Sequence, residues 1–268
     1  MQAERKSVYF VSDAHLGSGP EPERRERALA TWLTQLRARA SHLYILGDLF
    51  DFWFEYRHAI PRGHFRVLRA LADLADAGIA IAYLGGNHDF WCGSYLEQEI
   101  GVRVHYEAIR VEHEGRRIFL AHGDGLGPGD RGYRLLKAIL RHPLAIGLYR
   151  SIHPDLGIPL AHRVSGASRD HSRDRRHYLQ RLARHVATPE YGRGSDAIVI
   201  GHIHDPLHLQ DSAGRDFLIA GDWIEAFTYV ELRAGTFRLQ RWQERERAAE
   251  ALAARPWPAG LEPLHGGG

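Results

Sequence analysis

Five short segments of this chain carry side chains that could bind divalent metal ions. They are Ser12-Asp13-Ala14-His15, Gly47-Asp48, Gly86-Asn87-His88-Asp89, His122-Gly123-Asp124 and Gly201-His202-Ile203-His204. Their donors are carboxylate and amide oxygens and imidazole nitrogens, which suit borderline-hard ions such as Mn²⁺, Fe²⁺ or Zn²⁺. Together they suffice for two adjacent ions, and such a pair activates water and stabilises the attacking and leaving oxygens of displacement at phosphorus. The sequence therefore predicts a metal-dependent phosphoesterase.

The spacing within the segments favours shared ligation. Asp13 and His15 are two residues apart at a predicted strand end, and side chains at i and i+2 of a strand project the same way, so both can reach one ion. His202 and His204 repeat this spacing, and Asp48 is a carboxylate that could bridge two ions. One such segment alone also fits a polar turn. Five of them in order, each at a strand end, point instead to a metal centre.

The elements that must position these donors are visible as apolar runs and amphipathic stretches. Eight runs predict strands at residues 8–11, 43–46, 79–84, 118–121, 197–200, 217–220, 228–232 and 237–241. The first five are nearly continuous in apolar residues, which is typical of strands covered on both faces. Helical periodicity at 24–40 and 64–77 gives the order β-α-β-α-β, which favours a parallel sheet.

Two antiparallel features are expected beside this parallel core. Residues 102–112 and 118–121, with Glu114-Gly115 between them, predict a hairpin. The last three runs predict an antiparallel meander. The metal donors follow the apolar runs within one to three residues, and ligands bind at this carboxyl edge of open α/β sheets. The five segments are therefore expected to meet there.

Composition limits the classes of protein that the chain can belong to. It has 268 residues and a single cysteine, Cys92, so it has no internal disulfide. The N-terminus lacks the apolar stretch of a signal peptide, and no apolar run approaches the roughly 18 residues that cross a bilayer. We expect a cytoplasmic protein with no obligate protein partner.

The net charge of +2 hides a strongly basic segment at residues 131–185. This segment has twelve lysines and arginines but only three acidic residues. Such an excess suggests an anionic partner, namely phosphate, nucleic acid or a membrane surface. The alternative is a solvated helical face in an arginine-rich sequence.

We expect one domain over residues 1–250, with an insertion in it. Residues 125–188 have Gly and Pro punctuation followed by helical periodicity, which predicts a helical insertion over the active-site edge. Residues 254–268 are rich in Pro and Gly and are expected to be a disordered tail.

The ordered segments resemble the calcineurin-like metallophosphoesterases. That pattern is D-x-H, G-D, G-N-H-D/E, H-G and G-H-x-H, and the chain matches all five parts between about residues 7 and 242. The resemblance implies an α/β fold of two facing mixed β-sheets flanked by helices. It implies that Asp13, His15, Asp48 and His204 bind one ion and that Asp48, Asn87, His122 and His202 bind the other. It also implies that His88 is not a ligand but donates a proton to the leaving oxygen or stabilises charge, oriented by Asp89.

The flanking residues resemble one branch of that family, the UDP-2,3-diacylglucosamine diphosphatases of lipid A biosynthesis. The matching stretches are Gly47–Trp53, Asn87–Trp91, Gly201–Pro206 with His208, and Gly221–Trp223. The branch has a helical lid at the place of the insertion, and it cleaves the lipid-linked nucleotide at the α-phosphorus to give UMP and 2,3-diacylglucosamine 1-phosphate. Mn²⁺ is the expected metal. Substrate contacts are then expected from Asn87, His88, Asp130, Tyr133, Ser168, Arg175 and His202.

Two further expectations concern the insertion. Its apolar residues could form a groove for acyl chains, or they could merely pack the insertion onto the core. Its arginines could face phosphate or anionic head groups, with the protein peripheral on the cytoplasmic face of the inner membrane. The apolar candidates are Leu135, Leu136, Ile139, Leu140, Leu144, Ile146, Leu148, Tyr149, Ile152, Leu156, Ile158 and Leu160.

One residue departs from the branch and keeps alternatives open. Many members have Arg where this chain has His88, which favours a related enzyme acting on another phosphodiester or nucleotide as the second hypothesis. A non-catalytic scaffold is a third, but it would be expected to have lost ligands. Nucleic-acid processing rests only on the arginine-rich segment, so no nucleic-acid partner is expected.

Overall fold

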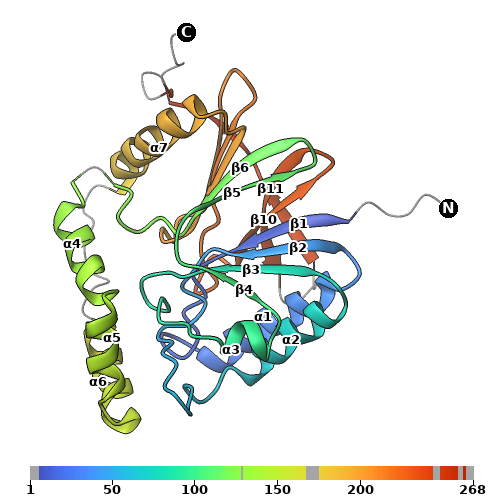
Figure 1. Cartoon of the computed structure of the whole chain (residues 1–268). Coiled ribbons are helices and arrows are strands. Elements are labelled where there is room, and N and C mark those ends of the chain that lie inside the picture. Colours follow the sequence, from blue (N-terminus) through green and yellow to red (C-terminus); the bar gives the residue numbers. More distant parts are fainter. Residues whose placement is uncertain (1–5, 128, 167–174, 244–247, 259–261, 264–268) are drawn as a thin grey trace.

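Two β-sheets face each other, and helices cover their outer faces (Figure 1). The computed structural model of the chain describes residues 6–127, 129–166, 175–243, 248–258 and 262–263. The predicted α/β architecture of two facing mixed sheets is confirmed.

The larger sheet has seven strands in the order β12-β11-β10-β1-β2-β3-β4. Strands β1 to β4 run parallel to one another, and β10 pairs antiparallel with β1. Helices α1 (Pro22–Leu36) and α2 (Phe65–Asp76) lie on its outer face. Helix α1 buries Leu29, Trp32 and Leu33 there. Helix α3 (Tyr95–Gln98) is a single turn. The strands are β1 (Ser7–Val11), β2 (Ala40–Ile45), β3 (Ala80–Leu84), β4 (Arg103–His105), β10 (Thr228–Arg233), β11 (Thr236–Gln243) and β12 (Ala248–Leu252).

The smaller sheet has six strands in the order β13-β8-β9-β7-β6-β5. Its outer face is covered by α7 (Arg175–Gly192), which buries Leu182, Ala183 and Val186 against it. The strands are β5 (Ile109–His113), β6 (Arg116–Ala121), β7 (Ala197–Ile200), β8 (Leu207–Gln210), β9 (Asp216–Ile219) and β13 (Arg255–Pro256).

The alternation of side chains along the strands builds three layers of core. In β1, Val8 and Phe10 point into the layer between the two sheets, whereas Tyr9 and Val11 point towards α1. All five residues of β1 are buried, which is why this strand reads as a continuous apolar run with one exception, Ser7. The expectation of strands covered on both faces is confirmed here.

Two expected antiparallel features are wrong in part. The turn at Glu114-Gly115 does join β5 to β6, but residues 102–112 are not one strand, because β4 lies in the larger sheet and β5 in the smaller. The last three runs do not form one meander either. β9 pairs with β7 and β8 in the smaller sheet, whereas β10 and β11 pair in the larger. Chain segments that cross between two sheets leave no mark in hydrophobic periodicity, since both sheets require the same pattern.

The insertion and the tail also differ from expectation. Helices α4 (Arg131–Leu140), α5 (Pro143–Arg150) and α6 (Pro154–Gly166) form a column beside the two sheets, but the second half of α7 belongs to the core (Figure 1). In the tail, β13 pairs parallel with β8, and Trp257 is buried against Phe217. The start of the predicted tail is therefore ordered.

Among the described residues, no helix combines the length and the apolar character that crossing a membrane requires.

Candidate active site

The loops that follow β1, β2, β3, β6 and β7 bring all five predicted segments to one edge of the two sheets. Four of the predicted ligands have left-handed backbone conformations, with φ of 53° at Asp13, 42° at His15, 51° at Asp48 and 65° at His202. Such conformations are rare for residues other than glycine and cost roughly 1–3 kcal/mol each. Asp13 and His15 therefore converge through strained loop geometry, because β1 ends at Val11, and not through the strand alternation expected from their spacing.

One group of donors lies around Asp13. The His15 Nε2 atom is 3.7 Å from Asp13 Oδ1, and the His204 Nε2 atom is 3.6 Å from the same oxygen. Asp13 Oδ1 and His15 Nε2 are buried and have no hydrogen-bond partner among the described residues. Buried polar atoms without partners are costly, and atoms bound to one ion at about 2.1 Å stand roughly 3–4 Å apart. This group therefore fits a divalent ion.

A second group lies around Asp48. The His122 Nε2 atom is 3.4 Å from Asp48 Oδ2 and 3.1 Å from the Asn87 side-chain oxygen, and His202 belongs to the same cluster of donors. The His122 Nδ1 atom donates to the Leu46 carbonyl oxygen at 2.7 Å, so Nε2 carries the lone pair that a metal requires. Asp48 Oδ2 also lies 3.7 Å from His15 Nε2, which places it between the two groups.

Glycine makes this close packing possible at two positions. A Cβ atom on Gly47, whose φ is +91°, would stand 2.6 Å from His122 Nδ1. A Cβ atom on Gly86 would overlap the Asp48 carboxylate. Any side chain at either position would therefore displace a ligand.

The buried histidines and carboxylates of the centre shift one another's pKa values in the metal-free protein. Burial by itself lowers the pKa of His15 and His122, but the neighbouring carboxylates, chiefly Asp13 for His15 and Asp48 for His122, outweigh it and raise each pKa to about 10. Burial would raise the pKa of Asp48, but His122 and His15 hold it well below its usual range. Divalent ions would replace the protons on these imidazoles, because metal ligation requires the neutral ring.

His88 reaches the same centre from the loop after β3. Its Nδ1 atom donates to the Asp51 carbonyl oxygen at 3.0 Å, which leaves Nε2 directed inward at 4.0 Å from Asp48 Oδ2. With His15 and Asp48 it forms a third cluster of candidate donors.

Asp89 has other partners than the one expected. Its fully buried carboxylate accepts hydrogen bonds from the backbone N–H groups of Asp48, Gly86 and Phe50 and from the Tyr83 hydroxyl. Asp51, not Asp89, is the acidic residue beside the His88 ring, with its Oδ1 atom 3.8 Å from His88 Nδ1. Asp89 therefore anchors the loops that carry the ligands.

The remaining predicted residues lie in or near the insertion. Asp130 accepts a hydrogen bond from the Gly127 N–H at 2.9 Å, and Tyr133 donates to Asp124 Oδ2 at 2.9 Å. Arg175 begins α7, but its side chain is outside the described part of the structure, and Ser168 lies outside the described residues.

Three acidic residues around the centre received no individual role from the sequence, although Asp124 stands in one of the five segments. Asp51 Oδ1 is 3.5 Å from His15 Nδ1, Asp222 Oδ2 is 3.5 Å from His204 Nδ1, and Asp124 pairs with Lys137 at 2.7 Å. The signal was available for Asp51 and Asp222, since both stand in stretches that carry the family resemblance. An acidic residue behind a metal-binding histidine fixes its ring and tautomer.

Aromatic residues beside the ligands hold the insertion in place. Tyr149 of α5 packs against Phe54 at 4.7 Å between ring centroids and stacks on Trp91 at 6.3 Å. The Trp91 indole N–H also donates to the Leu140 carbonyl oxygen at 3.2 Å. The Phe- and Trp-rich flanks of the metal segments therefore connect the insertion to the centre.

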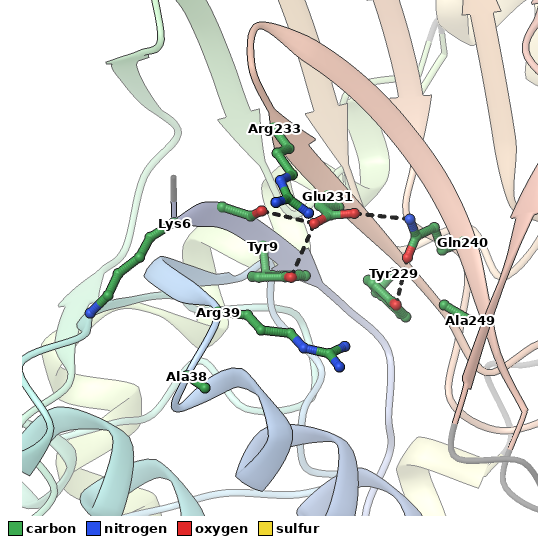
Figure 2. A pocket seen from close by; sticks show the side chains of 10 residues that line it. Lys6, Tyr9, Ala38, Arg39, Tyr229, Glu231, Arg233, Gln240 and Ala249 are labelled. Atoms are coloured by element: carbon green, nitrogen blue, oxygen red, sulfur yellow. Dashed lines mark hydrogen bonds between the residues drawn. The ribbon is translucent and has the colours of Figure 1, made fainter. Parts of the chain in front are cut away.

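A separate polar hollow of about 360 Å³ lies on the outer face of the larger sheet, near the start of β1 (Figure 2). Glu231, which lines it, accepts hydrogen bonds from Ser7, Tyr9 and Gln240, so this carboxylate is satisfied within the fold. None of the residues predicted for the site lines this hollow.

Comparison with known proteins places the chain in a family. The family model for calcineurin-like phosphoesterases matches residues 6–206. The UDP-2,3-diacylglucosamine hydrolase of Porphyromonas gingivalis is 38% identical over 90% of this chain and 100% of its own length. The protein of the same name from Nitrosococcus oceani is 30% identical over 81% of this chain and 87% of its own.

Among solved structures, Vacuolar Protein Sorting 29 of Cryptosporidium parvum aligns over 92% of this chain and 96% of its own, with 14% identity and a TM-score of 0.46. That likeness is too distant to bear on function. The family match, together with the hydrolase relatives and the clustered donors, is decisive. The chain belongs to the calcineurin-like phosphoesterase family and is a metal-dependent hydrolase.

Proposed function

We propose that this chain hydrolyses the pyrophosphate of UDP-2,3-diacylglucosamine at the α-phosphorus, which yields UMP and 2,3-diacylglucosamine 1-phosphate. The observation that carries the proposal is the 38% identity to a UDP-2,3-diacylglucosamine hydrolase along that relative's whole length. The juxtaposition of a metal centre with an apolar helical insertion supports it, because the substrate combines a pyrophosphate with two acyl chains.

We assign the ligands as the resemblance implies. Asp13, His15, Asp48 and His204 bind one ion, and Asp48 shares the second ion with Asn87, His122 and His202; the clustering of these donors supports the assignment. Mn²⁺ is the metal that we propose, since the donors are a mixture of oxygen and imidazole nitrogen. When bound, the ions supply activation of water and neutralisation of charge on the reacting phosphoryl group.

His88 is the residue that we propose as proton donor to the leaving phosphate oxygen. The Asp51 carbonyl oxygen holds its Nδ1–H, so the ring presents Nε2 to the space between the ligands. A proton or a hydrogen bond from this nitrogen would stabilise the negative charge that develops as the pyrophosphate bond breaks. Asp89 contributes indirectly, because it holds the backbone of Asp48 and Gly86.

The acyl chains are proposed to lie along α4 and α5. An apolar hollow of about 440 Å³ there is lined by Ala138, Ile139, His142, Leu144, Ala145 and Leu148. Leu144 and Leu148 are 72% and 74% exposed, so the view that the apolar residues only pack the insertion onto the core does not hold for them. Exposed apolar surface of this kind marks a binding site for apolar ligands or a membrane.

The same surface is the basis for a proposed peripheral contact with the cytoplasmic face of the inner membrane. Leu135, Leu156 and Leu160 extend the exposed apolar residues along α4 and α6, within the basic segment 131–185. Apolar contact combined with attraction to anionic lipids is the usual basis of peripheral binding.

The proposal is tested by UMP release from UDP-2,3-diacylglucosamine in detergent micelles, with and without Mn²⁺. Asp48→Asn is expected to reduce release at least about 10³-fold. The exposed Asp73→Asn on α2 is the matched control and should behave as wild type. If the wild-type protein releases no UMP but hydrolyses bis(4-nitrophenyl) phosphate with Mn²⁺, the lipid substrate is refuted and the alternative of another phosphodiester stands.

A further inference from the structure

Two cations, Lys137 of α4 and Arg141, the residue directly after it, lie at the base of the insertion, beside the metal centre. The Lys137 Nζ atom is 2.7 Å from Asp124 Oδ2, and the Arg141 guanidinium is 3.9 Å from the same oxygen. Asp124 follows the predicted metal ligand His122 by two residues, so its contacts with both cations place them beside the metal centre. Arg141 caps the C-terminal end of α4, where its backbone N–H donates to the Lys137 carbonyl oxygen, four residues earlier.

Arg141 is held rigidly against the loop that carries Asn87 and His88. Its guanidinium lies over the Phe90 ring, 3.5 Å from the centroid, and it donates to the Gly86 carbonyl oxygen at 3.1 Å. Gly86 in turn touches the Asp48 carboxylate so closely that it has no room for a Cβ atom. Only Gly86 therefore separates the Arg141 guanidinium from the ligand Asp48.

Two positive charges lie close to a single carboxylate at this place. Among the described residues, Asp124 is the one carboxylate within 4.0 Å of either cation, and Glu107 and Asp89 act on Arg141 only from farther away. The side chain of Arg141 is only 14% exposed, and its hydrogen bonds go to the carbonyl oxygens of Gly86 and Tyr106, which carry no net charge. A largely buried cation without a full counter-charge is unfavourable unless an anion completes it.

We propose that Lys137 and Arg141 bind the phosphate that leaves, the one attached to the acylated sugar, and so select substrates with a second phosphoryl group beside the scissile bond. This inference rests on the proposed function. The reason for choosing the leaving phosphate is that α4 also lines the apolar hollow through Ala138 and Ile139. The end of α4 and its cap thus present both cations and apolar surface, and the acylated sugar phosphate is the half of the substrate that carries both a phosphate and acyl chains.

The kinetic test compares two substrates in the Mn²⁺-loaded protein. Lys137→Met and Arg141→Met are each expected to lower kcat/KM for UDP-2,3-diacylglucosamine about 10- to 100-fold, since each removes one charge-assisted hydrogen bond to phosphate. For bis(4-nitrophenyl) phosphate, which has a single phosphoryl group, the loss should be several-fold smaller. Lys137→Arg should restore most of the activity, and Arg131→Met, an exposed residue at the start of α4, is the control. Equal losses on both substrates would overturn the inference.

A binding test separates this inference from the proposed function and from misfolding. The probes are 2,3-diacylglucosamine 1-phosphate in micelles, inorganic pyrophosphate and UMP, titrated by calorimetry into variants whose melting temperatures have been measured. Both variants should bind the first two probes at least about tenfold more weakly and UMP nearly as wild type. Unchanged affinity for pyrophosphate and for the lipid phosphate would overturn the inference. If wild type never hydrolyses the lipid nucleotide, the proposed function fails, and pyrophosphate binding by the same variants still decides whether this cation pair is an anion site.

Discussion

Replacing Asp89 by asparagine tests how the loops of the metal centre are held together. Each carboxylate oxygen accepts two hydrogen bonds, Oδ1 from the N–H groups of Asp48 and Gly86 and Oδ2 from the Phe50 N–H and the Tyr83 hydroxyl. An amide keeps one acceptor oxygen and puts an NH₂ group in place of the other, so two buried donors lose their partner. At about 1.5–3 kcal/mol for each hydrogen bond to a charged acceptor, Asp89→Asn should lower the free energy of unfolding by about 3–6 kcal/mol.

The assay is urea unfolding of the metal-free protein, followed by Mn²⁺ titration of the folded variant. Tyr83→Phe removes one of the four donors and should cost about 1–2 kcal/mol, whereas the exposed Asp73→Asn should cost nearly nothing. Because Asp89 fixes the backbone of Asp48, Mn²⁺ affinity should fall about 10- to 100-fold in Asp89→Asn. The reasoning is refuted if Asp89→Asn unfolds within about 1 kcal/mol of wild type and binds Mn²⁺ equally well.

Three further predictions concern Gly86, His113 and the histidines of the metal centre. Gly86→Ala should lose at least about tenfold in Mn²⁺ affinity, because the new Cβ displaces the Asp48 carboxylate; calorimetry showing wild-type affinity would contradict this. Burial and a neighbouring histidine lower the pKa of His113 to about 4. As the pH falls from about 6.5 to 4, the unfolded chain therefore binds a proton at this histidine that the folded chain does not, and the free energy of unfolding should drop by roughly 1–2 kcal/mol. The drop should be smaller in His113→Gln, and equal acid sensitivity of the two proteins in urea melts would count against this. The pKa of His15 and that of His122 are both raised to about 10 without metal. Mn²⁺ binding at pH 7.5 should therefore release about two protons, and the Mn²⁺ affinity should rise with pH. Calorimetric titrations in buffers of different ionisation enthalpy that detect no proton release would refute this.

The gathering of the donors could be predicted because it depends on topology. Parallel strands end at a common edge, so donors placed after apolar runs must meet there whatever the details of each loop. The structure brings Asp13, His15 and His204 together, and likewise Asp48, His122 and His202. Asn87 and His88 join them from the loop after β3.

The local backbone of the centre could not be predicted from the sequence. Asp13 and His15 adopt left-handed conformations, which are uncommon even for aspartate and histidine, and the surrounding hydrogen bonds and packing impose them. Asp89 follows His88 directly, yet its carboxylate points away to the Asp48 loop, which sequence adjacency does not indicate.

The insertion was recognisable from its composition, but its attachment was not. Helical periodicity does not reveal that Lys137 pairs with Asp124, a residue of the preceding loop, or that Tyr149 packs on Phe54, because each contact joins the insertion to a segment outside its helices. The ordered Trp257 was hidden for a similar reason. In composition, a short strand next to prolines looks the same as a disordered tail, and only its pairing with β8 in the structure distinguishes the two.

The most direct test of the central claim is hydrolysis of UDP-2,3-diacylglucosamine by the Mn²⁺-loaded protein in ¹⁸O-labelled water, with mass spectrometry of both products. We expect one ¹⁸O atom in UMP and none in the 2,3-diacylglucosamine 1-phosphate, because water attacks the α-phosphorus. Label in the lipid phosphate, or no turnover of this substrate by a protein that binds two metal ions, would contradict it.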